Sequence, residues 1–180
     1  MASLAGNESA DFSNLPIEQN RDLFVRDVVR ELVGILQDMI GLDDVEGYVS
    51  IVGARIGQRM NAEYRALSDQ EKLDVDHVAA ALVDLKRRID GGFSIESISD
   101  TEIVLSNTKC PFGAHVEGRP ALCMMTSNVF GRIAADNLGY AGVHIEEAIA
   151  RGDPGCRVII SLQRKPERAN IDFREYFSQD

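Results

Sequence analysis

The spacing of the hydrophobic residues changes at Gly91 and Gly92, and this change constrains the fold more than any other feature of the sequence. Before the two glycines, apolar residues recur every three or four positions, as they do in amphipathic helices. After them, apolar and polar residues alternate, as they do in half-buried strands, with one later return to helical spacing. The sequence therefore predicts an α+β fold in which helices precede an antiparallel sheet.

Two long helices are expected at the start of the chain. The first lies within residues 15–42 and ends at Gly41, because glycine readily adopts the backbone that ends a helix. The second begins near Asp43, whose charge suits a helix N-terminus, and ends around Leu67. The first helix carries an apolar face between Leu23 and Ile40, which predicts a dimer or partner surface.

Two local patterns refine the helical part. Gly53 and Gly57 are four residues apart on one face of the second helix, which predicts the close approach of another backbone. Ser68 and Glu71 have the spacing of a capping box, in which each side chain satisfies a backbone amide of the other. This pattern predicts that a third helix begins at Ser68 and continues to about Asp90.

Four strands are expected after Gly92, arranged as two hairpins that flank a helix. The expected elements are strands at Phe93–Ile98 and Glu102–Ser106, a helix at Ala121–Leu138, and strands at Val143–Ile149 and Cys156–Leu162. The predicted architecture is thus N-terminal helices packed against an antiparallel four-stranded sheet.

The overall charge narrows the classes of partner. The formal net charge is −10, whereas proteins that bind nucleic acid offset phosphate charge with clustered Lys and Arg. The first residues lack the cationic start and apolar stretch of a signal peptide, and no run reaches the roughly 18 apolar residues of a membrane span. We therefore expect a cytoplasmic protein that contacts neither membrane nor nucleic acid directly.

Three cysteines are the residues most suited to chemistry. Cys110 follows a predicted strand, Cys123 lies in the first turn of a predicted helix, and Cys156 begins the last predicted strand. The spacing permits the three thiols to converge, and a helix N-terminus would favour thiolate at Cys123. An odd number of cysteines in a cytoplasmic chain favours thiol, metal or cluster chemistry over a disulfide framework.

Three thiolates and one further ligand are typical of zinc sites and of iron-sulfur clusters. His115 is the nearest fourth donor, and Asp153 and His144 are weaker candidates. The alternative is that the cysteines are buried or simply reactive, because no C-x-x-C motif is present and free cysteine packs well in apolar surroundings.

A family resemblance rests on the same residues. The strings Thr-Lys-Cys-Pro-Phe-Gly at 108–113, Arg-Pro-Ala-Leu-Cys at 119–123 and Gly-Asp-Pro-Gly-Cys at 152–156 resemble the sensory domains of the 4-vinyl reductase-like superfamily. Within that group the chain is most similar to the methanogen output domain proteins. The cysteine pattern is also similar to that of the sensor half of iron-sulfur-biogenesis repressors, whose DNA-binding winged helix has no counterpart here.

The resemblance implies a dimeric sensory or signal-output module in which Cys110, Cys123 and Cys156 bind a small ligand or a metal centre, either an iron-sulfur cluster or zinc. His115 would be a further metal ligand, and the output would pass to a signalling or regulatory protein. The chain then divides into a disordered arm (1–14), an N-terminal helix (15–42), a sensory domain (43–165) and a C-terminal tail (166–180). Two alternatives remain open: a cysteine-dependent enzyme of the reductase or hydrolase type, and a plain dimeric interaction scaffold.

Overall fold

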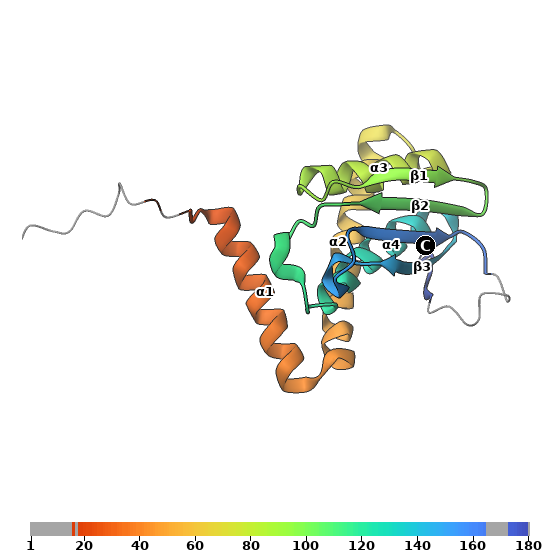
Figure 1. Ribbon diagram of the computed structural model, residues 1–180. Helices are drawn as coiled ribbons and strands as arrows, with labels where there is room; N and C mark the ends of the chain where they lie inside the picture. Colours follow the sequence, from red (N-terminus) through yellow and green to blue (C-terminus); the bar gives the residue numbers. More distant parts are fainter. Residues whose placement is uncertain (1–15, 17, 165–172, 180) are drawn as a thin grey trace, which may run out of the picture.

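The computed structural model describes residue 16, residues 18–164 and residues 173–179, except the side chains of residues 114 and 115. Its elements form the expected α+β fold (Figure 1). In chain order they are α1 (Arg21–Ile40), α2 (Leu42–Ser68), α3 (Val75–Arg88), β1 (Ser94–Ile98), β2 (Glu102–Asn107), α4 (Ala121–Leu138), β3 (Tyr140–Glu147), β4 (Cys156–Ser161) and β5 (Arg174–Phe177), with short 3-10 helices η1 (Gly113–Val116) and η2 (Ile149–Arg151).

Within the described residues the sheet has five strands in the order β1-β2-β4-β3-β5, and every neighbouring pair is antiparallel. The prediction of four strands was therefore one strand short. The fifth strand comes from the predicted C-terminal tail and pairs with β3, where Ala141 lies opposite Tyr176. Tyr176 is buried, and its hydroxyl lies 3.0 Å from the hydroxyl of Ser127 on α4. Burial of this side chain against α4 explains why the terminal segment becomes a strand.

Two of the helical predictions, both concerning glycines, are confirmed. Gly41 has φ 87° and separates α1 from α2, as the glycine signal indicated. Gly53 and Gly57 face α4 closely: an added Cβ would lie 2.8 Å from Cβ of Asn128 and 2.9 Å from Cβ of Arg132 respectively. The two glycines are therefore required by helix packing.

The capping box at Ser68 was wrong. Ser68 is the last residue of α2, and its hydroxyl donates to the carbonyl of Tyr64 at 2.8 Å. Helix α3 begins later, after Asp74, whose carboxylate accepts from the backbone amide of His77 at 2.9 Å. An aspartate in extended conformation is an equally good N-cap, and the sequence pattern alone did not choose between the two.

Helix α4 lies between the sheet and α2 and is buried along most of its length. The main core fills the space between the sheet and helices α3 and α4. A smaller core joins the inner face of α1, the start of α2 and the loop after β2. Figure 1 shows α1 leaning away from the sheet and meeting α2 in a sharp V at Gly41. Within the described residues, none of the helices is both long and apolar enough to cross a membrane.

Candidate functional site

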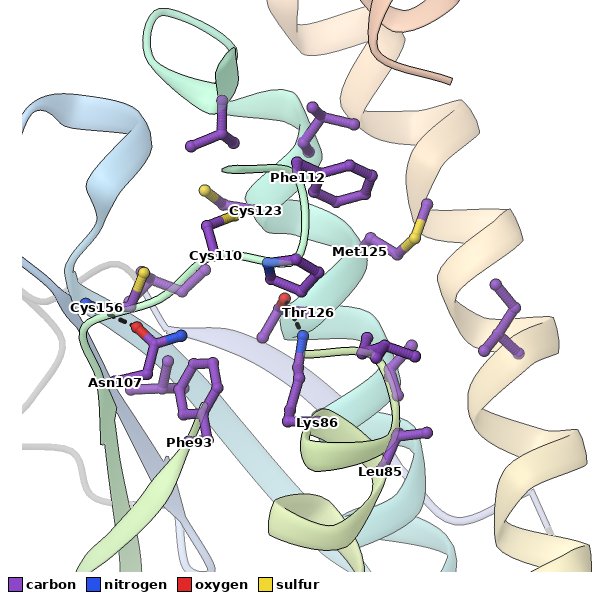
Figure 2. A pocket seen from close by; sticks show the side chains of 18 of the residues that line it. Leu85, Lys86, Phe93, Asn107, Cys110, Phe112, Cys123, Met125, Thr126 and Cys156 are labelled. Carbon is purple, nitrogen blue, oxygen red and sulfur yellow. Dashed lines mark hydrogen bonds between the residues drawn. The ribbon is translucent and has the colours of Figure 1, made fainter. Parts of the chain in front are cut away.

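The structure brings Cys110, Cys123 and Cys156 to the wall of one cavity of about 280 Å³ (Figure 2). All three thiols are free and half-buried. The cavity is mainly apolar, and its walls come from α2, α3, α4, the sheet and the loop after β2. The other residues that line it are Ile56, Arg59, Met60, Leu85, Lys86, Ile89, Phe93, Asn107, Pro111, Phe112, Val116, Leu122, Met125, Thr126, Val129, Ile145 and Val158.

Each cysteine lies where the local sequence predicted, with one correction. Cys110 is in the loop after β2, and its carbonyl accepts from the amide of Gly113 at 3.0 Å. Cys123 is in the first turn of α4, after Pro120. Cys156 begins β4, which is a central strand of the sheet and not the last strand. It therefore lies directly opposite Asn107 at the end of β2.

Asn107 ties together the segments that carry two of the cysteines. Its side-chain amide donates to the carbonyls of Gly91 at 2.7 Å and Lys109 at 2.8 Å. Its side-chain oxygen accepts from the amide of Cys156 at 3.1 Å. Figure 2 shows this last bond. Gly155 passes so close to the carbonyl of Asn107 that a side chain there would collide with it. The backbone positions of Cys110 and Cys156 are thus fixed through one buried amide.

Burial keeps two of the thiols protonated. It raises the pKa of Cys123 to about 12 and also raises the pKa of Cys110. The prediction that the helix N-terminus would favour thiolate at Cys123 is therefore wrong for the pocket as it stands. Desolvation in an apolar wall outweighs the partial charge of the helix end.

Lys86 is the unexpected residue of the cavity. It lies on α3 with only 6% of its surface exposed, and its Nζ donates to Oγ1 of Thr126 at 2.7 Å (Figure 2). The same Nζ lies 5.5 Å and 5.2 Å from the ring centres of Phe93 and Phe130. Burial lowers the pKa of Lys86 to about 8. The ammonium group is thus held in a largely apolar environment.

The structure gives little support to a fourth metal ligand. The side chain of His115 lies outside the described part of the chain. Asp153 accepts from the amide of Ala148 at 2.7 Å and so shapes the loop before β4. His144 lies beside the ring of Phe173, with ring centres 5.3 Å apart. Among the described residues, no three Cys, His, Asp or Glu side chains are grouped closely enough to hold a metal ion. Metal binding remains a prediction.

The loop that carries Cys110 also contacts α1. Nη1 of Arg26 on α1 donates to the carbonyl of Pro111 at 2.9 Å. Cys110 and Phe112 pack against the small core to which Val33 of α1 belongs. The inner face of α1 therefore rests on the loop that lines the cavity.

Sequence reasoning missed Lys86 and Asn107, although each carried a signal. Lys86 stands four residues after Leu82 on the apolar face of α3, where a lysine is out of place. Asn107 continues the alternation of the buried residues Ile103 and Leu105 on β2. A polar residue at a core position of a helix or strand is informative because its burial costs free energy unless something compensates it.

Comparisons with known proteins agree with this fold. The family model of methanogen output domain 1 matches residues 28–161. A search of curated protein sequences found no match. Among solved structures, the chain is similar to a trafficking protein particle complex subunit 3 from Naegleria fowleri that is covalently bound to palmitic acid. That likeness has a TM-score of 0.58 at 15% identity and covers 79% of this chain and 95% of the other.

Proposed function

Because the chain belongs to the methanogen output domain 1 family, we propose that it is a signal-output module whose cavity binds a small apolar ligand and whose N-terminal helix reports occupancy to a partner. The single observation that carries the proposal is the cavity itself. Ligand pockets are typically concave, mostly apolar and furnished with a few converging polar groups. The cavity around the three cysteines has these properties, with Lys86, Thr126 and Asn107 as the polar groups.

The structural neighbour supports an apolar ligand. The Naegleria subunit is covalently bound to palmitic acid, so a protein of similar fold carries a hydrocarbon chain. The cavity here, at about 280 Å³, is close to the lower end of the range for small-molecule sites, which begins at about 300 Å³.

The loop from Cys110 to Phe112 connects the cavity with α1. It lines the cavity on one side, and on the other it accepts the hydrogen bond from Arg26 of α1. A ligand that displaces Pro111 would change this contact directly. We infer that occupancy biases the position of α1, which is the element that leans away from the body of the protein in Figure 1.

The outer face of α1 is the output surface, and its occupant is a second copy of the chain. Exposed apolar side chains form a stripe along the helix: Phe24, Val28, Leu32, Ile35 and Met39, with exposed fractions between 48% and 75%. Arg21 at the start of α1 and Asp38 near its end are also exposed. An antiparallel pair of such helices would bury the stripe and bring these opposite charges together, as a two-fold interface requires.

A cavity-filling variant tests the pocket. Leu85 lines the cavity and is 8% exposed, whereas Leu67 lies outside it and is 87% exposed. Calorimetric titration with octan-1-ol should show binding to the wild type and to Leu67→Phe, with at least a tenfold loss in Leu85→Phe. Circular dichroism would verify that both variants are folded. Equal binding by all three proteins would contradict the apolar pocket.

Metal analysis and ultraviolet-visible spectra of protein purified without oxygen test the alternative occupant. The small-ligand proposal predicts colourless protein without stoichiometric iron or zinc. One equivalent of zinc, or the absorption of an iron-sulfur cluster, lost on replacing Cys123 by Ser, would instead favour the metal centre that the sequence suggested.

Light scattering coupled to size-exclusion chromatography tests the output surface. The wild type and Leu67→Asp should be dimers, and Leu32→Asp should be a monomer, because the new charge interrupts the apolar stripe of α1. A monomeric wild type, or a dimeric Leu32→Asp, would show that the stripe does not join two copies.

A further inference from the structure

Among the residues that the structure describes, no counterion accompanies the ammonium group of Lys86 at the cavity. Its Nζ reaches the hydroxyl of Thr126 and the faces of two aromatic rings, which are neutral partners. No Asp or Glu occurs among the residues that line the cavity, and within the described part of the chain no carboxylate forms an ion pair with Lys86. The other cationic side chain of the wall, Arg59, is exposed and lies on α2.

Two of the three cysteines, Cys110 and Cys123, do not provide the missing negative charge. The pKa of Cys110 and that of Cys123 are both raised by burial, so these thiols are neutral at physiological pH. A buried cation without a paired anion is costly in a protein, and a buried charge is normally paired. The cost at Lys86 can be offset by an anion that enters the cavity.

We propose that the cavity selects a small amphiphilic carboxylic acid, whose carboxylate pairs with Lys86 and whose hydrocarbon body contacts Phe112, Leu122 and Val129. This inference rests on the proposed function and names its ligand class. The carboxylate accepts from Nζ of Lys86 and from the hydroxyl of Thr126, which keeps its own proton available while it accepts from the lysine. The acid binds without forming a covalent bond, so the three thiols remain free.

The charge of the pocket favours a carboxylate over a phosphate ester. One buried ammonium group balances one negative charge. A phosphate monoester carries about 1.5 to 2 negative charges at pH 7, so part of its charge would remain unbalanced in an apolar wall. Arg59 is placed to attract the anion during entry, because it is exposed at the edge of the same cavity.

Three probes of equal chain length separate the effect of the ligand's charge from the effect of burying its hydrocarbon chain: octanoate, octan-1-ol and octylamine. Calorimetric titration at pH 7 should show that the wild type binds octanoate at least tenfold more tightly than octan-1-ol and binds octylamine weakest. In Lys86→Met the preference for octanoate over octan-1-ol should disappear. Lys72→Met, which removes an exposed lysine outside the cavity, should behave as the wild type.

The outcomes distinguish this inference from the proposed function. If the wild type binds octan-1-ol as tightly as octanoate, the role of Lys86 is refuted and the apolar pocket stands. If none of the probes binds, both are refuted. Should Lys86→Met not fold, a pH series on the wild type decides: octanoate affinity should fall as pH rises from 7 to 9.5 and Lys86 loses its proton, while octan-1-ol affinity stays constant.

Discussion

Replacing Lys86 by methionine measures how much the buried charge of Lys86 lowers the free energy of unfolding when no ligand is bound. Methionine retains a flexible, unbranched side chain but carries no charge. Burial lowers the pKa of Lys86 from 10.5 to about 8, so the folded protein holds this proton less tightly than the unfolded chain does. Charged Lys86 therefore reduces the free energy of unfolding at neutral pH, and the variant lacks this penalty.

The magnitude follows from the two pKa values. Each tenfold change in proton affinity corresponds to about 1.4 kcal/mol, so a pKa lowered from 10.5 to about 8 amounts to about 3 kcal/mol at pH 7. Between pH 8 and 10.5 the unfolded chain binds more protons at this group than the folded protein, so its contribution to stability rises with pH. The hydrogen bond to Thr126 opposes the penalty by about 1 kcal/mol, so the decisive quantity is the pH dependence.

Urea unfolding followed by circular dichroism at pH 7, 8, 9 and 10 provides the assay. The free energy of unfolding of Lys86→Met minus that of the wild type should decrease by about 2 to 3 kcal/mol over this range. The subtraction removes the titration of groups that are common to both proteins and do not interact with Lys86. Lys72→Met, with its exposed lysine, should show no such trend. A difference that stays constant from pH 7 to 10 would refute the description of Lys86 as a buried, unpaired cation.

Three further predictions concern the surroundings of the cavity. Gly131→Ala should lower the free energy of unfolding by about 1 to 3 kcal/mol in urea denaturation, because the added methyl group meets the ring of Tyr176 and displaces β5. The free energy of unfolding of Cys123→Ala minus that of the wild type should increase by about 1.4 kcal/mol between pH 8 and 10, since the unfolded thiol ionises near pH 9 while the pKa of the folded thiol is about 12. Asn107→Ala should lower the free energy of unfolding by at least about 2 kcal/mol, because it leaves three backbone groups without their hydrogen-bond partner. The variant should also speed the reaction of Cys156 with a thiol reagent. An unchanged reaction rate would contradict the positioning role of Asn107.

Much of the local structure could be predicted from the sequence because it depends on the spacing of apolar residues and on the positions of glycines. The change of period at Gly91 and Gly92 separates α3 from β1, and Gly41 divides α1 from α2 as predicted. The closely spaced Gly53 and Gly57 indicated the packing with α4 before any partner was known. Apolar spacing and glycine positions can each be recognised within one short segment of the sequence, without knowledge of the segments that pack against it.

Only part of the candidate site could be predicted from the sequence. The sequence placed each cysteine on its element correctly, and the structure shows that all three line one cavity. It predicted thiolate at Cys123 from the helix N-terminus, whereas the surrounding apolar wall raises the pKa of that thiol. Desolvation depends on atoms contributed by several elements, so a local argument about one helix end could not weigh it.

The sequence by itself thus determined the α+β class, the helix boundaries at glycines and the elements that carry the three thiols. Only the tertiary structure decided that the C-terminal segment joins the sheet as β5, that Asn107 links β2 to Cys156, and that Lys86 lies at an apolar cavity with no counterion among the described residues. The reason is physical: hydrophobic spacing is a property of one segment, whereas strand pairing and the compensation of a buried charge depend on groups that are distant in the chain and meet only when it folds.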